Sequence, residues 1–451
     1  MGIEHRDFGT RGRPSYSPRL LMRLWIYGYF ERIRSCRALE KACRQHVGFM
    51  WLCGNQPPDH NTLWRFWTSN RESLRRLFEQ SIRVSDALGL VGLTLQAVDG
   101  TKIQAACHAG KGYDAKDLER RLVNVDKQIK ELEVAIEEAE KTGQAPETDL
   151  PSNLHDKKAL REAVQRAKEQ LQSAPARKYC HPQELEAQRI KQARGGKPFG
   201  YNAQAVVDDK AQIIVAADAV AEATDYGQLT PMLGQAASNR ERLQASENKE
   251  ESSSSLMSLG DGGYSSNEQI AKSEAEGHEV LMPVHSASTC NESAPYHTSK
   301  FHYDSEGDVV RCPQGRELPF RRTRTIGRSP QLWREYRSAE ACRDCPVKEQ
   351  CTKDRHGRTI NISQWHEAGR RHAEKMKQEA NQDLLKKRAK IVEPVFGQIK
   401  SNGGFKRWTF KGLKKVQAQW FMLCSAWNLK VAYQKWRSEI MRSGTDCSVA
   451  A

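Results

Sequence analysis

The sequence lacks any apolar run that approaches the length of a membrane-spanning helix, and its first residues lack the clean apolar segment of a secretory signal. Only 38% of the 451 residues are hydrophobic, and the mean hydropathy is −0.75. These absences argue against a membrane-spanning or secreted protein. We therefore expect a globular chain of two or three domains in the cytoplasm, with no membrane partner.

Acidic residues are scarce at the two ends of the chain. The whole sequence has 71 Lys and Arg against 56 Asp and Glu, which gives a formal net charge of +15. The basic excess lies in residues 1–80 and 386–451, whereas the middle is slightly acidic. Between Asp383 and Glu439 the single acid is Glu393. Two basic ends predict a polyanionic partner, most simply nucleic acid.

Helical patterns occupy residues 15–85. Ser17 and Pro18 fit the start of a first helix, residues 36–52 fit a second, and a third follows Pro and Asp59. The apolar face of the third helix comprises Leu63, Phe66, Trp67 and Leu74. Short helices with Arg-rich outer faces fit a helix-turn-helix-like DNA-binding module, and they equally fit an ordinary helical bundle.

The periodicity then changes to that of strands. Apolar residues alternate over 93–103 and share a face with Asp99, and further strand patterns precede Asp261. A helix with Glu393 comes later, so the order predicts a mixed α/β fold with acids at strand ends. Heptad spacing within residues 115–173 predicts an inserted helical hairpin that is structural or a dimer contact.

Asp99, Asp261 and Glu393 lie on separate segments, as ligands that approach metal ions from different directions must. Three carboxylates can hold two divalent cations about 3.5–4 Å apart, and oxygen ligands favour Mg²⁺ or Mn²⁺. The two aspartates equally fit turn formers, and the glutamate equally fits a solvated surface charge. Helical spacing puts Lys400 on the face of Glu393, where it would hold a DNA phosphate, and Pro394 would kink this helix or mark its start.

Twelve cysteines without a secretion signal are expected to be reduced thiols. Four of them fall in one region, namely Cys312, Cys342, Cys345 and Cys351. Structural zinc takes four such ligands in a tetrahedron, with His356 as a substitute ligand here. The alternative is a set of buried reduced thiols.

With these residues in view, the chain resembles the DDE-superfamily transposases of bacterial insertion sequences. It is most similar to the branch with a helical insertion and a cysteine-bearing insertion. The resemblance spans roughly residues 15–435. The matching segments are CRALEKACR, PPDHNTLWRFW, AVDGTKIQA, KPFGYNAQAVVDD, LGDGGYSS, CRDCPVKEQC and RAKIVEPVFGQIKSNGGFKRWTFKGLKKVQAQW. The most specific of them contain YNAQAVVD and VEPVFGQIK, in this order and spacing.

The resemblance implies a ribonuclease H-like mixed sheet flanked by helices, and it assigns catalysis to Asp99, Asp261 and Glu393. Family members often have a Tyr where Leu385 stands, whereas the basic residue that follows is retained as Arg388. The expected domains are an all-α DNA-binding domain (1–85), the catalytic domain (90–440), the hairpin insertion (115–175), the cysteine-bearing insertion (286–367) and a tail (441–451).

The expected function is transposition. The protein would bind terminal inverted repeats, cleave phosphodiester bonds with two metal ions, and transfer 3′ ends to target DNA as a nucleoid-associated homodimer or larger assembly. The residues expected to contact DNA are Lys400, Arg388, Lys406, Arg407 and Arg65. The alternatives are a domesticated metal-dependent nuclease and a DNA-binding regulator without catalysis, and the intact acid triad argues against the regulator.

Overall fold

The computed structural model describes residues 15–108, 112–141, 150–191, 196–247, 256–284, 295–325 and 332–443. The chain divides into two compact units, one of residues 1–254 with 389–451 and one of residues 255–388. Both contain helices and strands, so the predicted mixed α/β class is confirmed. Most of the expected C-terminal tail lies outside the described residues. Among the described helices, none combines the length and apolar character needed to cross a membrane.

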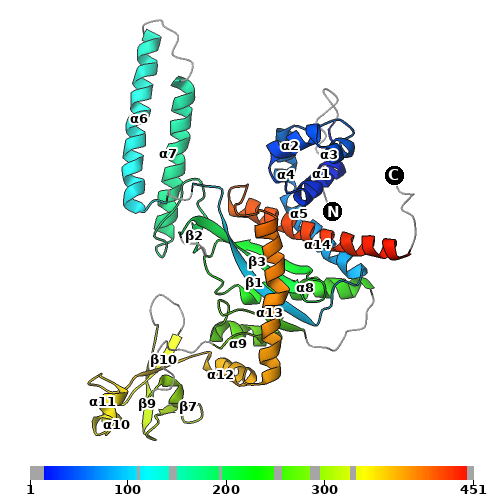
Figure 1. The fold of residues 1–451 in the computed structure, drawn as a ribbon. Helices are drawn as coiled ribbons and strands as arrows, with labels where there is room; N and C mark the ends of the chain where they lie inside the picture. The colour runs from blue at the N-terminus through cyan, green and yellow to red at the C-terminus, as the bar shows by residue number, and fades with distance from the viewer. Residues whose placement is uncertain are drawn as a thin grey trace. The chain divides into compact units, whose positions relative to one another are not determined.

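The first unit is built on an antiparallel sheet with helices around it (Figure 1). Its elements are α1 (Pro18–Phe30), α2 (Cys36–Gln45), α3 (Val47–Leu52), α4 (His60–Ser69), α5 (Arg71–Ala87), β1 (Leu95–Gln104), α6 (Ala115–Lys141), α7 (Leu150–Ser173), β2 (Gln188–Arg189), β3 (Phe199–Asp208), β4 (Ile214–Val220), α8 (Leu229–Glu247), the π-helical turn η2 (Gln398–Asn402) and α14 (Leu413–Ser443).

The central strand of this sheet is β3, which is buried along its whole length. It pairs with β1 on one edge and with β2 and then β4 on the other, always antiparallel. Helix α14 packs on β4, where Asn428 bonds both backbone groups of Ile214 and reaches Ser81 on α5. The Trp420 indole donates to the Gln204 carbonyl at 2.8 Å. Helix α14 is therefore held between the sheet and the N-terminal helices.

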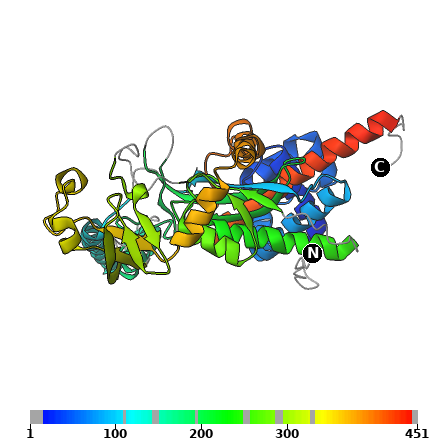
Figure 2. The same cartoon turned by 90° about the horizontal axis from the view of Figure 1, so that it is seen from below.

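The N-terminal helices differ from the prediction at two breaks. Residues 36–52 form two helices because the backbone at His46 is extended, with φ −112° and ψ 120°. The third expected helix ends at Asn70, whose side-chain amide donates to the Phe66 carbonyl at 3.0 Å. Its start is as expected, since an Asp59 carboxylate oxygen accepts from the Thr62 amide at 2.7 Å. Figures 1 and 2 show these helices gathered beside α14.

Helices α6 and α7 form a long antiparallel pair (Figure 1). Its apolar seam includes Leu118, Leu122, Val164, Ala167 and Leu171, all buried. Ion pairs cross the two helices outside this seam, for example Arg161 with Asp126. The heptad spacing thus correctly indicated two packed helices.

The second unit contains a parallel strand pair and a separate antiparallel sheet. Its elements are β5 (Met257–Leu259), α9 (Asn267–Ala275), β6 (Glu279–Leu281), the 3₁₀ turn η1 (Thr298–Lys300), β7 (His302–Asp304), β8 (Val309–Arg311), β9 (Glu317–Thr325), β10 (Leu332–Tyr336), α10 (Ala339–Arg343), α11 (Lys348–Cys351), β11 (Ile360–Ser363) and α12 (His366–Lys375). The separate sheet has the order β11-β10-β9-β8-β7. Helix α13 (Glu379–Gly397) spans the boundary between the units.

Candidate active site

Asp99 lies in β1 where the strand stops being continuously buried. The four preceding residues are buried, whereas Asp99 and Gly100 are half-buried. Asp99 is paired with Ala205 of β3, and one of its carboxylate oxygens accepts from the Gly100 amide at 2.8 Å. The strand pattern therefore correctly placed this carboxylate on a strand and partly within reach of solvent.

A second acid, Asp225, lies against Gly100, the residue that follows Asp99 in β1. The sequence analysis did not identify Asp225 as a candidate. Its carboxylate accepts from the side-chain amides of Asn202 (2.8 Å) and Gln204 (2.9 Å), and it pairs with Lys102 at 3.3 Å. A Cβ at Gly100 would lie 2.4 Å from an Asp225 oxygen, so only glycine fits this cluster without displacement. The sequence signal for this cluster was Asn202 and Gln204, two polar residues that alternate within the otherwise mostly apolar strand β3.

Glu393 lies inside α13, which begins at Glu379 and continues to Gly397. The expectation that Pro394 marks the start of this helix is therefore wrong. A proline cannot donate to the carbonyl four residues earlier, that of Lys390. The Gln212 side-chain amide donates to this carbonyl instead, at 3.0 Å. This replacement bond lets the helix tolerate an internal proline directly after the candidate metal ligand.

The Glu393 side chain is exposed, although Val392 and Val395 beside it are fully buried. Within the described part of the chain, neither a hydrogen bond nor an ion pair engages its carboxylate, despite the basic residues around it. A carboxylate without an internal partner on the solvent side of a well-packed helix is free to bind an external cation.

Two contacts fix the direction of this helix relative to β1. Gln212, which bonds Lys390, belongs to the turn beside the start of β1, since the Asp209 amide donates to the Leu95 carbonyl. Further on, the Lys400 ammonium donates to the Lys102 carbonyl at 3.3 Å. The helix and the strand therefore run in the same direction.

The second contact relates the positions of the two acids in the chain. Asp99 lies three residues before Lys102 along β1. Glu393 lies seven residues before Lys400, on the helix that leads to it. Asp99 and Glu393 therefore lie on two segments of the first unit that the bond between Lys400 and Lys102 joins.

The residues after Glu393 do not continue as a regular α-helix to Lys400. The backbone changes to a π-helical turn at Gln398–Asn402, so the expected single face from 393 to 400 is wrong in detail. Lys400 is half-buried, and burial, followed by the charge of Lys102, lowers its pKa below the usual range. Its ammonium packs against the strand that carries Asp99.

Asp261 belongs to the second unit, in the loop that follows β5. The short strands β5 and β6 are parallel, and α9 between them begins after Ser266, whose hydroxyl accepts from the Gln269 amide. One Asp261 carboxylate oxygen accepts from the Gly263 amide at 2.8 Å. This is the carboxyl end of a parallel strand, a common position for ligand-binding acids.

No group of three His, Cys, Asp or Glu side chains within the described ranges is arranged to hold a metal ion as it stands. Asp99 and Glu393 lie on one unit and Asp261 on the other. The assembly of all three acids into one site therefore remains a prediction.

The other residues expected to contact DNA differ in their solvent exposure and in their hydrogen bonds within the protein. Lys406 and Arg65 are exposed. The Arg407 guanidinium donates to the carbonyls of Ala105 (3.2 Å) and Cys107 (2.5 Å), so it also ties its segment to the end of β1. Arg388 is half-buried on α13. Trp408, Phe410 and Trp420 are buried, so these aromatic residues belong to the core.

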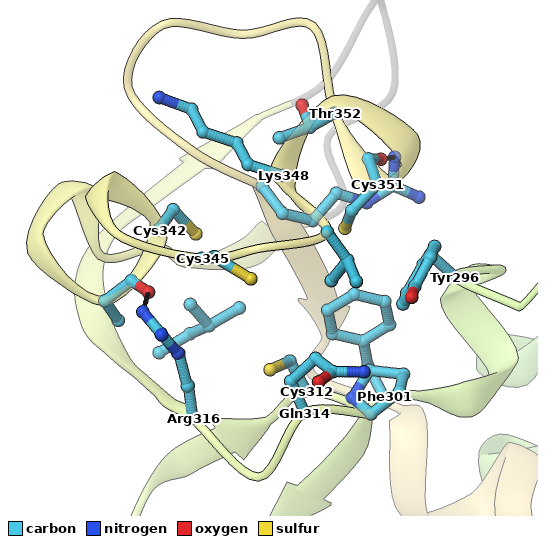
Figure 3. Close-up of a pocket in the computed structure, with 15 residues that line it drawn as sticks. Tyr296, Phe301, Cys312, Gln314, Arg316, Cys342, Cys345, Lys348, Cys351 and Thr352 are labelled. Carbon is cyan, nitrogen blue, oxygen red and sulfur yellow. Dashed lines mark hydrogen bonds between the residues drawn. The ribbon is translucent and has the colours of Figure 1, made fainter.

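The four expected zinc ligands are half-buried free thiols that line one cavity in the second unit (Figure 3). The pKa of the Cys351 thiol is raised, first by burial and also by the proximity of the other three cysteines. His356 is exposed, and its Nε2 accepts from Arg355 at 2.8 Å.

Comparison with known proteins gives two family matches. Residues 311–432 match the family described as a transposase DDE domain, and residues 4–69 match a second family described as a transposase domain. The first match includes Glu393, whereas Asp99 and Asp261 lie outside it. No curated protein and no solved structure matches the chain. Both matches are to transposase domains, one near each end of the sequence, and they support the similarity of the chain to DDE-type transposases of insertion sequences.

Proposed function

We propose that this protein is a transposase that cleaves DNA at the ends of its element and joins the 3′ ends to a target, with Asp99, Asp261 and Glu393 as the ligands of two Mg²⁺ or Mn²⁺ ions. The observation that carries the proposal is the exposed Glu393 carboxylate, without a partner among the described residues, on a helix whose continuation is bonded to β1 through Lys400. The strand to which it is bonded is the one that carries Asp99.

The strand arrangement supports a ribonuclease H-like fold. The first unit contains three longer antiparallel strands in the order β4-β3-β1, and the second contains the parallel pair β5 and β6 joined by α9. An acid in β1, an acid after β5 and an acid on a late helix are what this fold uses for metal-dependent DNA chemistry. The donor set also fits, because hard oxygen ligands suit Mg²⁺ and Mn²⁺.

Within such a site the ions would activate water or a 3′-hydroxyl and stabilise the departing oxygen. The carboxylates orient the reacting groups by holding the ions in fixed positions. Lys400 has a half-buried ammonium against β1, which suits a DNA phosphate next to the scissile bond. Lys406 adds an exposed charge to the same segment.

Recognition of the terminal repeats is assigned to the N-terminal helices. Arg37, Lys41 and Arg44 are exposed and recur at helical spacing on one face of α2. Arg65 is exposed on α4, which packs against α2 through the bond between His60 and Glu40 (2.8 Å). A basic face on packed short helices suits the DNA backbone. Cutting both ends of one element suits action as a homodimer or larger assembly at the nucleoid.

The test is strand cleavage and strand transfer on duplexes that carry the ends of the element. Asp99→Asn, Asp261→Asn and Glu393→Gln should each abolish both reactions while DNA binding in a mobility-shift titration is kept. The losses should not add when combined, because the acids act as one unit. Glu379→Gln is the matched control, an exposed acid in the first turn of the same helix, and should remain active.

Each outcome discriminates between functions. Near-normal cleavage by Glu393→Gln would remove this residue from the active site and refute the proposal. Cleavage without strand transfer would identify a nuclease. Binding without cleavage in the wild-type protein, with either cation present, would identify a DNA-binding regulator.

A further inference from the structure

Helices α10 and α11 have well-defined positions although they contribute almost nothing to a hydrophobic core. They contain five and four residues, and none of these residues is buried. Isolated helices of this length are not stable in water, because each has too few hydrogen bonds to offset its nucleation. The nearby core of the separate sheet is small, with Val310, Leu318, Tyr336, Ile360 and Ile362. Another interaction must hold these two turns.

The four cysteines on these elements converge on one cavity, of about 30 Å³. They come from three segments: Cys312 from the turn after β8, Cys342 and Cys345 from α10 and the loop after it, and Cys351 from the end of α11. Figure 3 shows the four sulfur atoms placed around this space from different sides. A cavity of this size has room for a particle as large as a water molecule, so a metal ion fits within it.

The backbone around the cavity is fixed by hydrogen bonds from two arginines. The Arg316 guanidinium donates to the carbonyls of Ala341 (2.5 Å) and Asp344 (2.9 Å), so it ties the turn of Cys312 to α10. Arg358 donates to the Cys351 carbonyl at 3.3 Å. These bonds orient the backbone that carries the thiols without occupying the thiols themselves.

Gly357 is a second indication that the backbone is closely fitted around the cysteines. Its φ is +88°, and a Cβ there would lie 2.8 Å from the Cys342 sulfur and 2.9 Å from the Ser338 carbonyl oxygen. The chain therefore approaches Cys342 as closely as a glycine permits.

We infer that Cys312, Cys342, Cys345 and Cys351 bind one structural Zn²⁺ ion that holds α10 and α11 to the separate sheet. Four thiolates from three segments are a donor set that zinc takes in its closed, tetrahedral sites. The four thiols are not arranged as a closed metal site as they stand, so binding involves rotation of their sulfur atoms about the Cα–Cβ bonds between staggered rotamers. The inference concerns folding of the second unit, so it stands or falls independently of the proposed catalysis.

The experiment is metal analysis of the full-length protein purified without chelators. We expect about one zinc per chain. Cys345→Ser and Cys351→Ser should each lose it, whereas Cys36→Ser, a half-buried thiol on α2, should keep it. Cobalt substituted for zinc should give the visible absorption of a tetrahedral thiolate site, and this absorption should be absent from Cys345→Ser.

Because a cysteine variant can fail to fold, the wild-type protein gives a second readout. Hydrogen exchange at α10 and α11 should become fast when zinc is removed by a chelator and slow again when Zn²⁺ alone is returned. Zinc-free protein with slow exchange in both helices would overturn the inference. So would zinc retained by both serine variants, or alkylation and mass analysis that reveal two disulfides in place of four thiols.

Discussion

Replacing Phe410 with alanine should release the N-terminal helices from the rest of the first unit. The Phe410 ring is 5% exposed and stacks on Trp67 and Trp64, with ring centroids 4.8 Å and 5.7 Å away, and Trp25 lies at 6.3 Å. Truncation of a buried Phe costs about 3–5 kcal/mol. Three aromatic contacts at about 0.5–1.5 kcal/mol each account for a large part of that cost.

The measurement is hydrogen exchange of α1 and α4 in the full-length protein. A loss of about 3 kcal/mol corresponds to a fall in protection of about 100-fold or more. Tyr433→Ala on α14 is the control, since Tyr433 is 54% exposed and should change stability by less than about 0.5 kcal/mol. Unchanged protection of α1 and α4 in Phe410→Ala would refute the conclusion that this ring anchors the N-terminal helices. If Phe410 anchors these helices, a fragment of residues 1–85 expressed alone lacks one residue of the core that holds them together.

Two further outcomes follow from the structure. Gly100→Ala would force a Cβ to within 2.4 Å of an Asp225 oxygen, so it should cost about 1–3 kcal/mol in thermal unfolding and reduce DNA cleavage. Gly234→Ala on α8 meets no atom within 4 Å and should instead stabilise, so equal melting shifts would contradict this reading. Burial lowers the pKa of His372, hence the unfolded chain binds more protons and stability should fall as pH drops below about 6.5. The melting temperature of His372→Gln should fall less over that pH range than that of the wild-type protein, and parallel curves would exclude this histidine as a cause.

The parts of the fold that were predictable are those in which local pattern and tertiary packing agree. The seam of α6 and α7 follows heptad spacing, and β1 alternates as a strand should. The breaks at His46 and Asn70 were not predictable, because both lie inside continuous helical patterns. At Asn70 a side-chain amide competes for a helix carbonyl, and the sequence does not reveal when this competition succeeds.

The candidate site likewise contains features that could be predicted from the local sequence and features that depend on long-range contacts. Asp99 and Glu393 were identified as candidates from their surroundings in the sequence, and the structure bonds the segment after Glu393 to the strand of Asp99 through Lys400. Asp225 was not identified because it lies in a loop and is positioned by contacts with residues distant in sequence, namely Asn202, Gln204 and Lys102. The bond from Gln212 that replaces the one lost at Pro394 is likewise a long-range contact. The local periodicity of the sequence gives no indication of this contact.

The base of the hairpin has a consequence for how the length of α6 and α7 relates to the sheet. Tyr113 and Cys180 form an antiparallel bridge, so the chain leaves the sheet of the first unit and returns to it at one point. The helices between them bury their own apolar seam. Lengthening, shortening or losing α6 and α7 therefore leaves β1 and β3 connected over the same short gap. The length of the hairpin is therefore structurally independent of the pairing between β1 and β3.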